Sequence, residues 1–502
     1  MPVGSGVDSR RATRGVSFVL TSVLLLASAR PSNGQDPVPK RPLGRDVLVY
    51  QPAPGDPERR EAPPIQNPTG TVSLRDAVAL ALLHNPRLAA FAWETRAREA
   101  RILQAGRPPN PVITTLVQDF GGNTGFVGAA DPIQSQTTIE LSQLIELGGK
   151  RAARQRLAAA DRDLAAWDYE AARIDVLTDV SRAFTDVLAA QEMVTLNART
   201  SQLVTQMQQS VAARVEAGVV SPIEETRANV ALALVQVESN RAVRGLEAAR
   251  RRLATNWGLS NAVFPGGTGN LEVVSALPPM TALMTRLSEN PDIARWATEI
   301  LQREAAVSAA RATRIPDVTF TAGYRRLSDI QATAFLFGAS FPLPLFDNNG
   351  GTVREARSML AKAYEEARAA EAQVSGRLTE AYRTLAVAHD EVGTLRTTVL
   401  PGSRETFEAV TEGYRAGKFG FLDVLDAQRT LIAAEGQYLR ALADYHKAVA
   451  DVERLIGAPL TDAGNVSTRL QPVARQTNES SFSPVNTGPG AQTEKGDRRG
   501  EQ

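Results

Sequence analysis

Few side chains in this chain of 502 residues could do chemistry. Cysteine is absent, and the 3 histidines, His84, His389 and His446, stand far apart. The absence of cysteine excludes disulfides, thiolate nucleophiles and cysteine-based zinc sites. An isolated histidine is a surface or packing residue more often than a ligand, so we predict no metal site. No Ser/His/Asp arrangement or phosphate-binding loop is present, so we predict no catalytic residue, no cofactor and no enzyme.

Carboxylates provide one candidate site. Glu405, Glu408 and Glu412 follow a spacing that places them on one face of a helix. Copies of this face in an oligomer would form acidic rings that suit a cation path, so these residues are a candidate gate or constriction. A solvated outer face, or pairing within the helix to Arg404 and Arg415, explains the same pattern without a gate.

Asp423 and Asp426 form a second carboxylate pair, three residues apart. They fall in the first turn of an expected helix, where the helix dipole favours negative charge. We therefore interpret them as helix-stabilising residues and not as acid–base catalysts.

The composition indicates long helices. The formal net charge is +1, so no global field favours nucleic acid, and aromatic residues make up only 5%. Ala, Arg, Glu and Leu recur in long runs, as they do in extended helices.

The first 29 residues are typical of a secretory signal peptide. Arg10, Arg11 and Arg14 precede the apolar run 15–26, and Ala27-Ser28-Ala29 resembles a cleavage site. The alternative is a membrane anchor, but the run is shorter than the roughly 20 apolar residues that span a bilayer. No other apolar run is long enough, so we expect any membrane-embedded part of the mature protein to consist of β-strands.

The ordered part of the sequence is a duplication with an offset of about 200 residues. His84-Asn85-Pro86 returns as Glu289-Asn290-Pro291, and Gly148-Gly149 returns as Gly350-Gly351. The predicted organisation is a signal peptide (1–29), a Pro-rich extended segment (30–70), a first repeat (71–258), a linker (259–277), a second repeat (278–458) and a disordered tail (459–502).

Each repeat contains two strand-like segments of membrane-crossing length. They cover 111–120 and 134–143 in the first repeat, and 317–325 and 332–341 in the second, with apolar and polar residues alternating most clearly in 317–325. A sheet edge cannot face lipid, and transmembrane barrels have at least about eight strands. Four strands therefore predict a shared barrel, with eight strands from two copies or twelve from three.

After the strands, each repeat becomes helical and folds back at a glycine turn. The long helical stretches cover 149–216 and 352–414, and we expect Pro401-Gly402 to kink the second one. Glycine permits positive φ at the turns, where Val219, Val220 and Phe419 would be exposed. Helix capping alone also explains these glycines. The candidate docking tips are Gly218, Val219, Val220 and Ser221, and Gly417, Lys418, Phe419 and Gly420.

The pattern resembles the TolC-like outer-membrane efflux protein family over nearly all of 70–458. The two-fold repeat, the Asn-Pro helix starts and the stretch 414–428 (YRAGKFGFLDVLDAQ) carry the resemblance. The stretch 145–151 (IELGGKR) is similar to the strand-to-helix junction of the cobalt–zinc–cadmium (CzcC-like) branch.

The resemblance implies a mainly α fold with a membrane β part. A homotrimer would share a twelve-stranded β-barrel in the outer-membrane lipid, continuous with a periplasmic twelve-helix α-barrel. A periplasmic adaptor (membrane fusion protein) would dock on the tips, and an inner-membrane RND pump would deliver divalent heavy-metal cations. Two alternatives stay open: a multidrug or type I secretion duct with the same fold, and a soluble periplasmic helical scaffold.

Overall fold

The computed structural model describes residues 68–118, 135–327 and 331–460. The expected signal peptide (1–29), nearly all of the extended segment (30–70) and the expected tail from residue 461 on lie outside these ranges. Both repeats are described apart from two connectors between strands, at 119–134 and 328–330.

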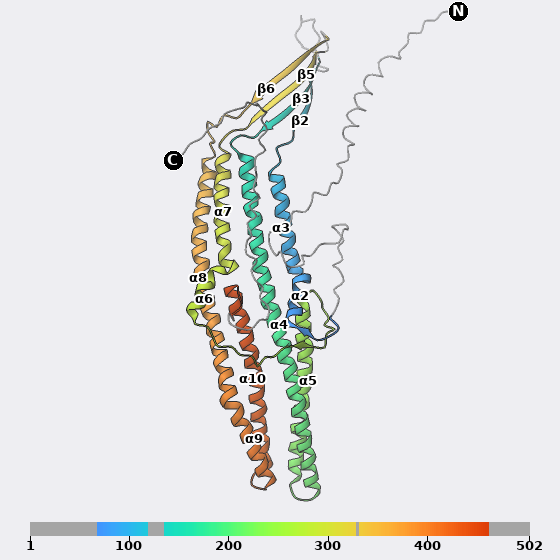
Figure 1. Cartoon of the computed structure of the whole chain (residues 1–502). Coiled ribbons are helices and arrows are strands. Elements are labelled where there is room, and N and C mark those ends of the chain that lie inside the picture. Colours follow the sequence, from blue (N-terminus) through green and yellow to red (C-terminus); the bar gives the residue numbers. More distant parts are fainter. Residues whose placement is uncertain (1–67, 119–134, 328–330, 461–502) are drawn as a thin grey trace, which may run out of the picture. The chain divides into compact units, whose positions relative to one another are not determined.

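After a two-residue strand, the first repeat passes through two helices, two longer strands and a long helix hairpin (Figure 1). Ser73 starts the first helix with a capping box, because its hydroxyl accepts the Asp76 N–H at 3.2 Å and the Asp76 carboxylate accepts the Ser73 N–H at 3.2 Å. The elements are β1 (Val72–Ser73), α2 (Leu74–His84), α3 (Pro86–Ala105), β2 (Val112–Gln118), β3 (Gln136–Ile145), α4 (Lys150–Glu216) and α5 (Pro222–Thr255).

The second repeat follows the same order, but its long helix is interrupted. The short strand β4 (Gly267–Thr268) precedes the second repeat, which begins with α6 (Met280–Arg286) and the 3-10 turn η1 (Leu287–Glu289). The repeat continues with α7 (Pro291–Ala312), β5 (Val318–Leu327), β6 (Ala332–Ser340), α8 (Gly350–Thr394), the π-helical segment η2 (Leu395–Val399), α9 (Leu400–Arg415) and α10 (Phe421–Ile456).

Two asparagines show the duplication at the level of single hydrogen bonds. The Asn85 carboxamide caps α3, with its oxygen 2.8 Å from the nearest backbone nitrogen, and its Nδ2 donates to Asn256 O at 2.7 Å. Asn290 caps α7 in the same way, at 2.7 Å, and its Nδ2 donates to Leu455 O at 2.7 Å. Each asparagine therefore starts one helix and holds the end of the returning helix of its own repeat.

One antiparallel sheet joins the strands of both repeats in the order β2-β3-β5-β6. Residues paired across the sheet share a face. The paired row Thr114, Glu140 and Gly323 is largely polar, whereas the row Leu141, Ala322 and Phe337 is apolar. Leu336 continues the first row and is an apolar exception on the polar face. Among the described residues β2 and β6 each have one unpaired edge.

The helices pack as neighbours in a strip. Next to the strands the order is α3, α4, α7 and α8, and farther along α4 the order is α5, α4, α10 and α9 (Figure 1). The main core lies between these helices and includes Val180 of α4, Leu378 of α8 and Leu442 of α10, all fully buried. No helix within the described ranges combines the length and the apolar character that crossing a membrane requires.

Residues 259–277, expected as a linker, lie across α4 and α10 as a strap. The Gln191 side chain of α4 donates to Gly267 O at 3.0 Å, and His446 of α10 lies 2.8 Å from Leu271 O. The Tyr438 hydroxyl donates to the Glu272 carboxylate at 2.5 Å, and burial together with this bond raises the pKa of Tyr438 to about 12. The strap therefore connects the helix hairpins of the two repeats.

The interruption of the second long helix has a local cause. α4 continues for 67 residues, whereas η2 separates α8 from α9 immediately before Pro401. Proline has no N–H to donate to the carbonyl four residues earlier. The helix widens instead, and Leu400 N–H bonds to Leu395 O, five residues back. At the expected kink, the structure therefore has a π-helical segment that ends two residues before Pro401.

Candidate functional site

The turn between α4 and α5 is a Schellman motif. Gly218 N–H donates to Val215 O at 2.9 Å, and Val219 N–H donates to Arg214 O at 2.8 Å. The motif requires a left-handed residue, and Gly218 has φ 72°. Ser221 then starts α5 by accepting the Ile223 N–H at 3.4 Å.

The turn between α9 and α10 repeats this design. Gly417 N–H donates to Tyr414 O at 3.0 Å and Lys418 N–H donates to Gly413 O at 2.7 Å, with φ 75° at Gly417. The Asp423 carboxylate accepts the N–H of Gly420, the N-cap of α10, at 2.8 Å. The structure therefore gives Asp423 a helix-capping contact.

The side chains of the tips differ in exposure. Val219 is 63% exposed, Val220 is half-buried, and Ser221, Lys418 and Gly420 are exposed. Phe419 is 47% exposed because its ring lies against Gly413, where a Cβ atom would clash with it. Phe419 thus offers one face of its ring at the tip.

A small apolar cluster joins the two hairpins just behind the turns. It packs Val204 and Val211 of α4 and Ala228 of α5 against Phe421 and Leu425 of α10. The two tips therefore belong to one end of the strip, as Figure 1 shows.

One contact beside this cluster was missed by the sequence reasoning. The Arg214 guanidinium lies over the Tyr414 ring, 4.7 Å from its centroid. Burial raises the pKa of the Tyr414 hydroxyl, and the neighbouring Arg214 partly opposes this rise. Arg214 lies four residues before Gly218, and Tyr414 lies three residues before Gly417, so aligning the two repeats places the pair at neighbouring positions before the turns.

The three carboxylates of the candidate gate lie on one exposed face of α9. Glu405, Glu408 and Glu412 are all exposed and pair with no basic group in the part of the chain that the structure describes. The alternative of pairing with Arg404 does not hold, because Arg404 binds Glu435 of α10 at 3.1 Å. α10 comes close enough to attract the arginine and leaves the glutamates without a cation.

The histidines stay apart. His84 ends α2, His389 lies 3.4 Å from the neighbouring Asp390, and His446 contacts the strap. Within the described ranges no three His, Asp or Glu side chains gather in a way that could hold a metal ion.

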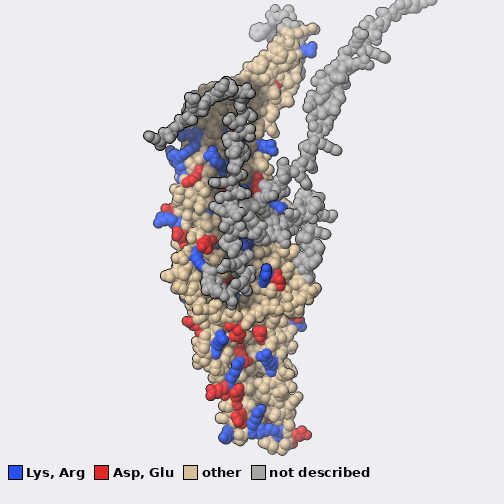
Figure 2. All heavy atoms as spheres, in the orientation of Figure 1, with Lys and Arg blue, Asp and Glu red and all other residues tan. Residues whose placement is uncertain are grey.

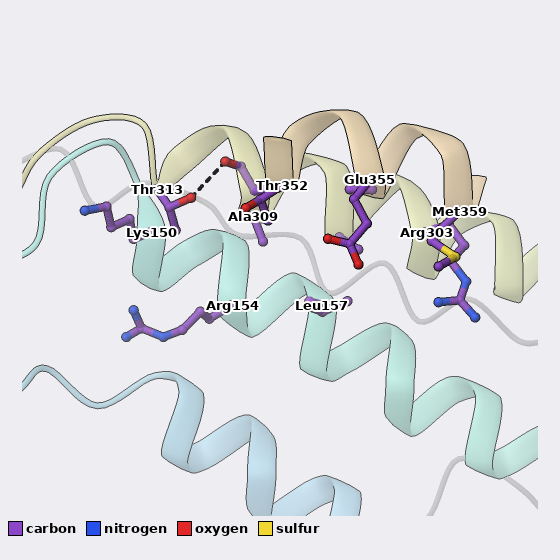
Figure 3. Close-up of a pocket in the computed structure, with 12 residues that line it drawn as sticks. Lys150, Arg154, Leu157, Arg303, Ala309, Thr313, Thr352, Glu355 and Met359 are labelled. Carbon is purple, nitrogen blue, oxygen red and sulfur yellow. Dashed lines mark hydrogen bonds between the residues drawn. The ribbon is translucent and has the colours of Figure 1, made fainter. Parts of the chain in front are cut away.

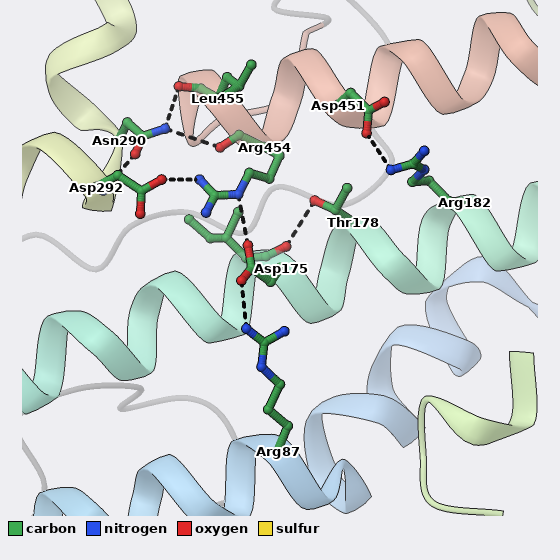
Figure 4. Close-up of polar contacts among 10 residues, drawn as sticks. Arg87, Asp175, Thr178, Arg182, Asn290, Asp292, Asp451, Arg454 and Leu455 are labelled. Atoms are coloured by element: carbon green, nitrogen blue, oxygen red, sulfur yellow. Dashed lines mark hydrogen bonds and ion pairs between the residues drawn. The ribbon is translucent and has the colours of Figure 1, made fainter. Parts of the chain in front are cut away.

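A charged network ties the repeats together at the middle of the strip (Figure 4). Arg454 of α10 donates to Asp175 of α4 at 2.9 Å and to Asp292 of α7 at 2.8 Å. Arg87 of α3 also binds Asp175, at 3.0 Å. Farther along α4, Arg182 pairs with Asp451 at 3.1 Å, and burial raises the pKa of this aspartate. These contacts position the hairpins of the two repeats relative to each other.

Charge is distributed as a channel wall requires. Figure 2 shows mixed acidic and basic side chains along the helices and almost none over the strands. The exposed apolar residues Ile113, Phe335 and Phe337 are 72%, 76% and 84% exposed on the strands. Apolar strands joined to charged helices define a channel-type membrane protein that extends into an aqueous compartment.

Comparison with known proteins agrees with this class. The family described as outer membrane efflux protein matches residues 77–259 and 283–458, and the chain belongs to this family. The cobalt-zinc-cadmium resistance protein CzcC of Cupriavidus metallidurans is 35% identical over 77% of this chain and 90% of its own length. The nickel-cobalt-cadmium resistance protein NccC of Alcaligenes xylosoxydans is 26% identical over 66% of this chain and 73% of its own.

Solved channel structures share the fold. CusC superposes with a TM-score of 0.66 at 15% identity, covering 77% of this chain and 92% of its own. The CmeC outer membrane channel of Campylobacter jejuni gives 0.63 at 18% identity, covering 76% and 85%. The resemblance to TolC-like channels and their CzcC-like branch is confirmed, and the protein is an outer-membrane efflux duct.

Proposed function

We propose that three copies of the chain form one continuous tunnel that lets heavy-metal cations leave the cell. The open edges of β2 and β6 are the structural observation that supports assembly, because exposed edges are unfavourable in lipid and four strands are too few for a barrel. Pairing β6 of one copy with β2 of the next would give a twelve-stranded barrel. The strip of helices would close in the same way into a periplasmic tunnel.

Divalent heavy-metal cations are the proposed substrates. The 35% identity to a cobalt-zinc-cadmium resistance protein carries this proposal. The unpaired face of Glu405, Glu408 and Glu412 agrees with it, because three copies would give three acidic rings near the tips. Rings of carboxylates attract cations and repel anions without holding them tightly, which a conduit requires.

The two tips are the proposed docking surface for a periplasmic adaptor, which would connect the duct to an inner-membrane RND pump. Val219 and one face of the Phe419 ring are the apolar groups available there. The glycine turns fix their position, because each Schellman motif sets where the chain leaves its helix.

A deletion strain tests the substrate. Loss of the gene should lower tolerance to cobalt, zinc and cadmium while leaving tolerance to organic antibiotics unchanged, and the intact gene should restore it. Unchanged metal tolerance together with increased antibiotic sensitivity would reject metal export in favour of the multidrug alternative.

The acidic rings have their own test in planar lipid bilayers. Replacing Glu405, Glu408 and Glu412 together with glutamine should lower the cation-to-anion permeability ratio. The matched control is Glu371→Gln, an exposed glutamate of α8 far along the chain from the tips. An unchanged ratio in the triple variant would show that these residues do not line the path.

A further inference from the structure

A groove runs over α7 between α4 and α8, at the end of these helices next to the strands (Figure 3). Its volume is about 400 Å³, which is enough for a small organic molecule. Alanines of α7 and α8 form most of its floor, and Leu157 of α4 and Met359 of α8 extend it. The groove is therefore mainly apolar.

The cations around the groove are already neutralised. Lys150 binds Asp317 at 2.7 Å, and Arg303 binds Glu299 at 2.6 Å. Arg154 holds both carboxylate oxygens of Glu146. Each of these three basic side chains thus shares its charge with a carboxylate outside the groove lining, so the groove offers little to an anion.

Glu355 is the remaining charge in the lining. Figure 3 shows its carboxylate directed from α8 into the groove. It has no hydrogen-bond or ion-pair partner among the described residues. One uncompensated carboxylate over an apolar floor favours a ligand that combines a positive charge with apolar bulk.

The groove faces away from the strap. On α4, Leu157 of the groove and Phe184 beneath the strap are separated by 27 residues, about seven and a half helical turns. On α8, Glu355 and Tyr382, whose hydroxyl donates to Pro278 O beside the strap, have the same separation. The strap would obstruct a tunnel if it lay inside, so in the proposed trimer the groove would line the tunnel.

We propose that this groove binds lipophilic organic cations on the inner wall of the duct. A bare divalent metal ion is a poor fit, because such ions take six or more oxygen ligands and the groove offers one carboxylate. An organic cation needs only the charge of Glu355 and contact with the apolar floor. The placement on the tunnel wall rests on the proposed trimer, whereas the binding chemistry does not.

Tetraphenylphosphonium is a suitable probe because tetraphenylborate has the same shape and the opposite charge. Both are titrated into the purified full-length protein in detergent, with detergent alone as a blank. We expect saturable binding of the cation and weaker binding of the anion. Glu355→Gln should weaken cation binding about fivefold or more, whereas the matched variant Glu371→Gln should leave it unchanged.

A second variant tests the apolar floor without changing charge. Ala309→Phe should fill the groove and reduce cation binding while leaving the helical circular dichroism unchanged. Equal cation affinity in the original protein and Glu355→Gln would overturn the proposal, as would equal affinity for both probes or no saturable binding. These results would not affect the metal-tolerance test, which measures export in cells.

Discussion

Replacing Arg454 with glutamine would test whether the charged network holds the two repeats together. Arg454 is 20% exposed and makes one charge-assisted hydrogen bond to Asp175 and one to Asp292. Such bonds contribute about 1.5–3 kcal/mol each. Asp175 keeps its bond to Arg87, whereas Asp292 loses the one cation that it binds in the described part of the chain. We therefore expect the free energy of unfolding to fall by about 2–3 kcal/mol.

Arg87→Gln is the matched control. Arg87 binds the same Asp175, but its side chain is 53% exposed, so its loss should cost less than about 1 kcal/mol. Thermal unfolding followed by far-ultraviolet circular dichroism should order the midpoints as Arg454→Gln lowest, then Arg87→Gln, then the original protein. Adding Asp292→Asn to Arg454→Gln should recover about 1 kcal/mol, because it removes the orphaned charge. Equal midpoints for the two arginine variants would refute this reasoning.

Three further predictions concern the tips and the helix packing. Gly417→Ala should destabilise the protein by about 1 kcal/mol, because Gly417 has φ 75°. Gly376→Ala inside α8 should stabilise it by about 0.5–1 kcal/mol, because a Cβ atom there meets open space and glycine is unfavourable within a helix. Denaturant titration of both variants measures these changes. Burial raises the pKa of Asp179, so its folded pKa exceeds its unfolded pKa and stability should fall as pH rises from the ordinary aspartate range through the folded value. Asp179→Asn should then stabilise the protein at neutral pH and not in acid. A plot of the melting temperature of this variant against pH that has the same slope as that of the original protein would contradict this. Phe419→Glu should abolish adaptor binding in pull-down experiments while the trimer persists; retained binding would move the docking surface elsewhere.

Structural features that depend on local periodicity could be predicted from the sequence. The alternation in 317–325 predicts a strand, and β5 occupies Val318–Leu327. The segment 332–341 is likewise predicted as a strand, and β6 occupies Ala332–Ser340. The channel fold follows from the duplication and the family resemblance and is confirmed by the solved channels. These features depend on neighbours within a few residues or on a whole-chain pattern.

Structural features that depend on packing between distant segments could not be predicted from the sequence. Pairing of Arg404 with glutamates of its own helix is one alternative that the sequence offers, whereas the structure places Arg404 against Glu435 of α10. Arg454 meets Asp175 across 279 residues, and no periodicity predicts such a pair. The groove at Glu355 likewise arises only when three helices are side by side. The roles of the tips and of the acidic face stay predictions.

The unpaired edges of β2 and β6 make folding and assembly a single problem for this protein. Joining β6 of one copy to β2 of the next is a head-to-tail contact, and such contacts grow into open filaments unless the rotation between copies closes a ring. Prolines flank both edges, with Pro111 before β2 and Pro342 after β6, so the hydrogen-bonded ladder cannot extend past the strand at these ends. If the proposed trimer forms, the apparent stability of the strand region should rise with protein concentration, and a lone copy would be an assembly intermediate with two open sheet edges.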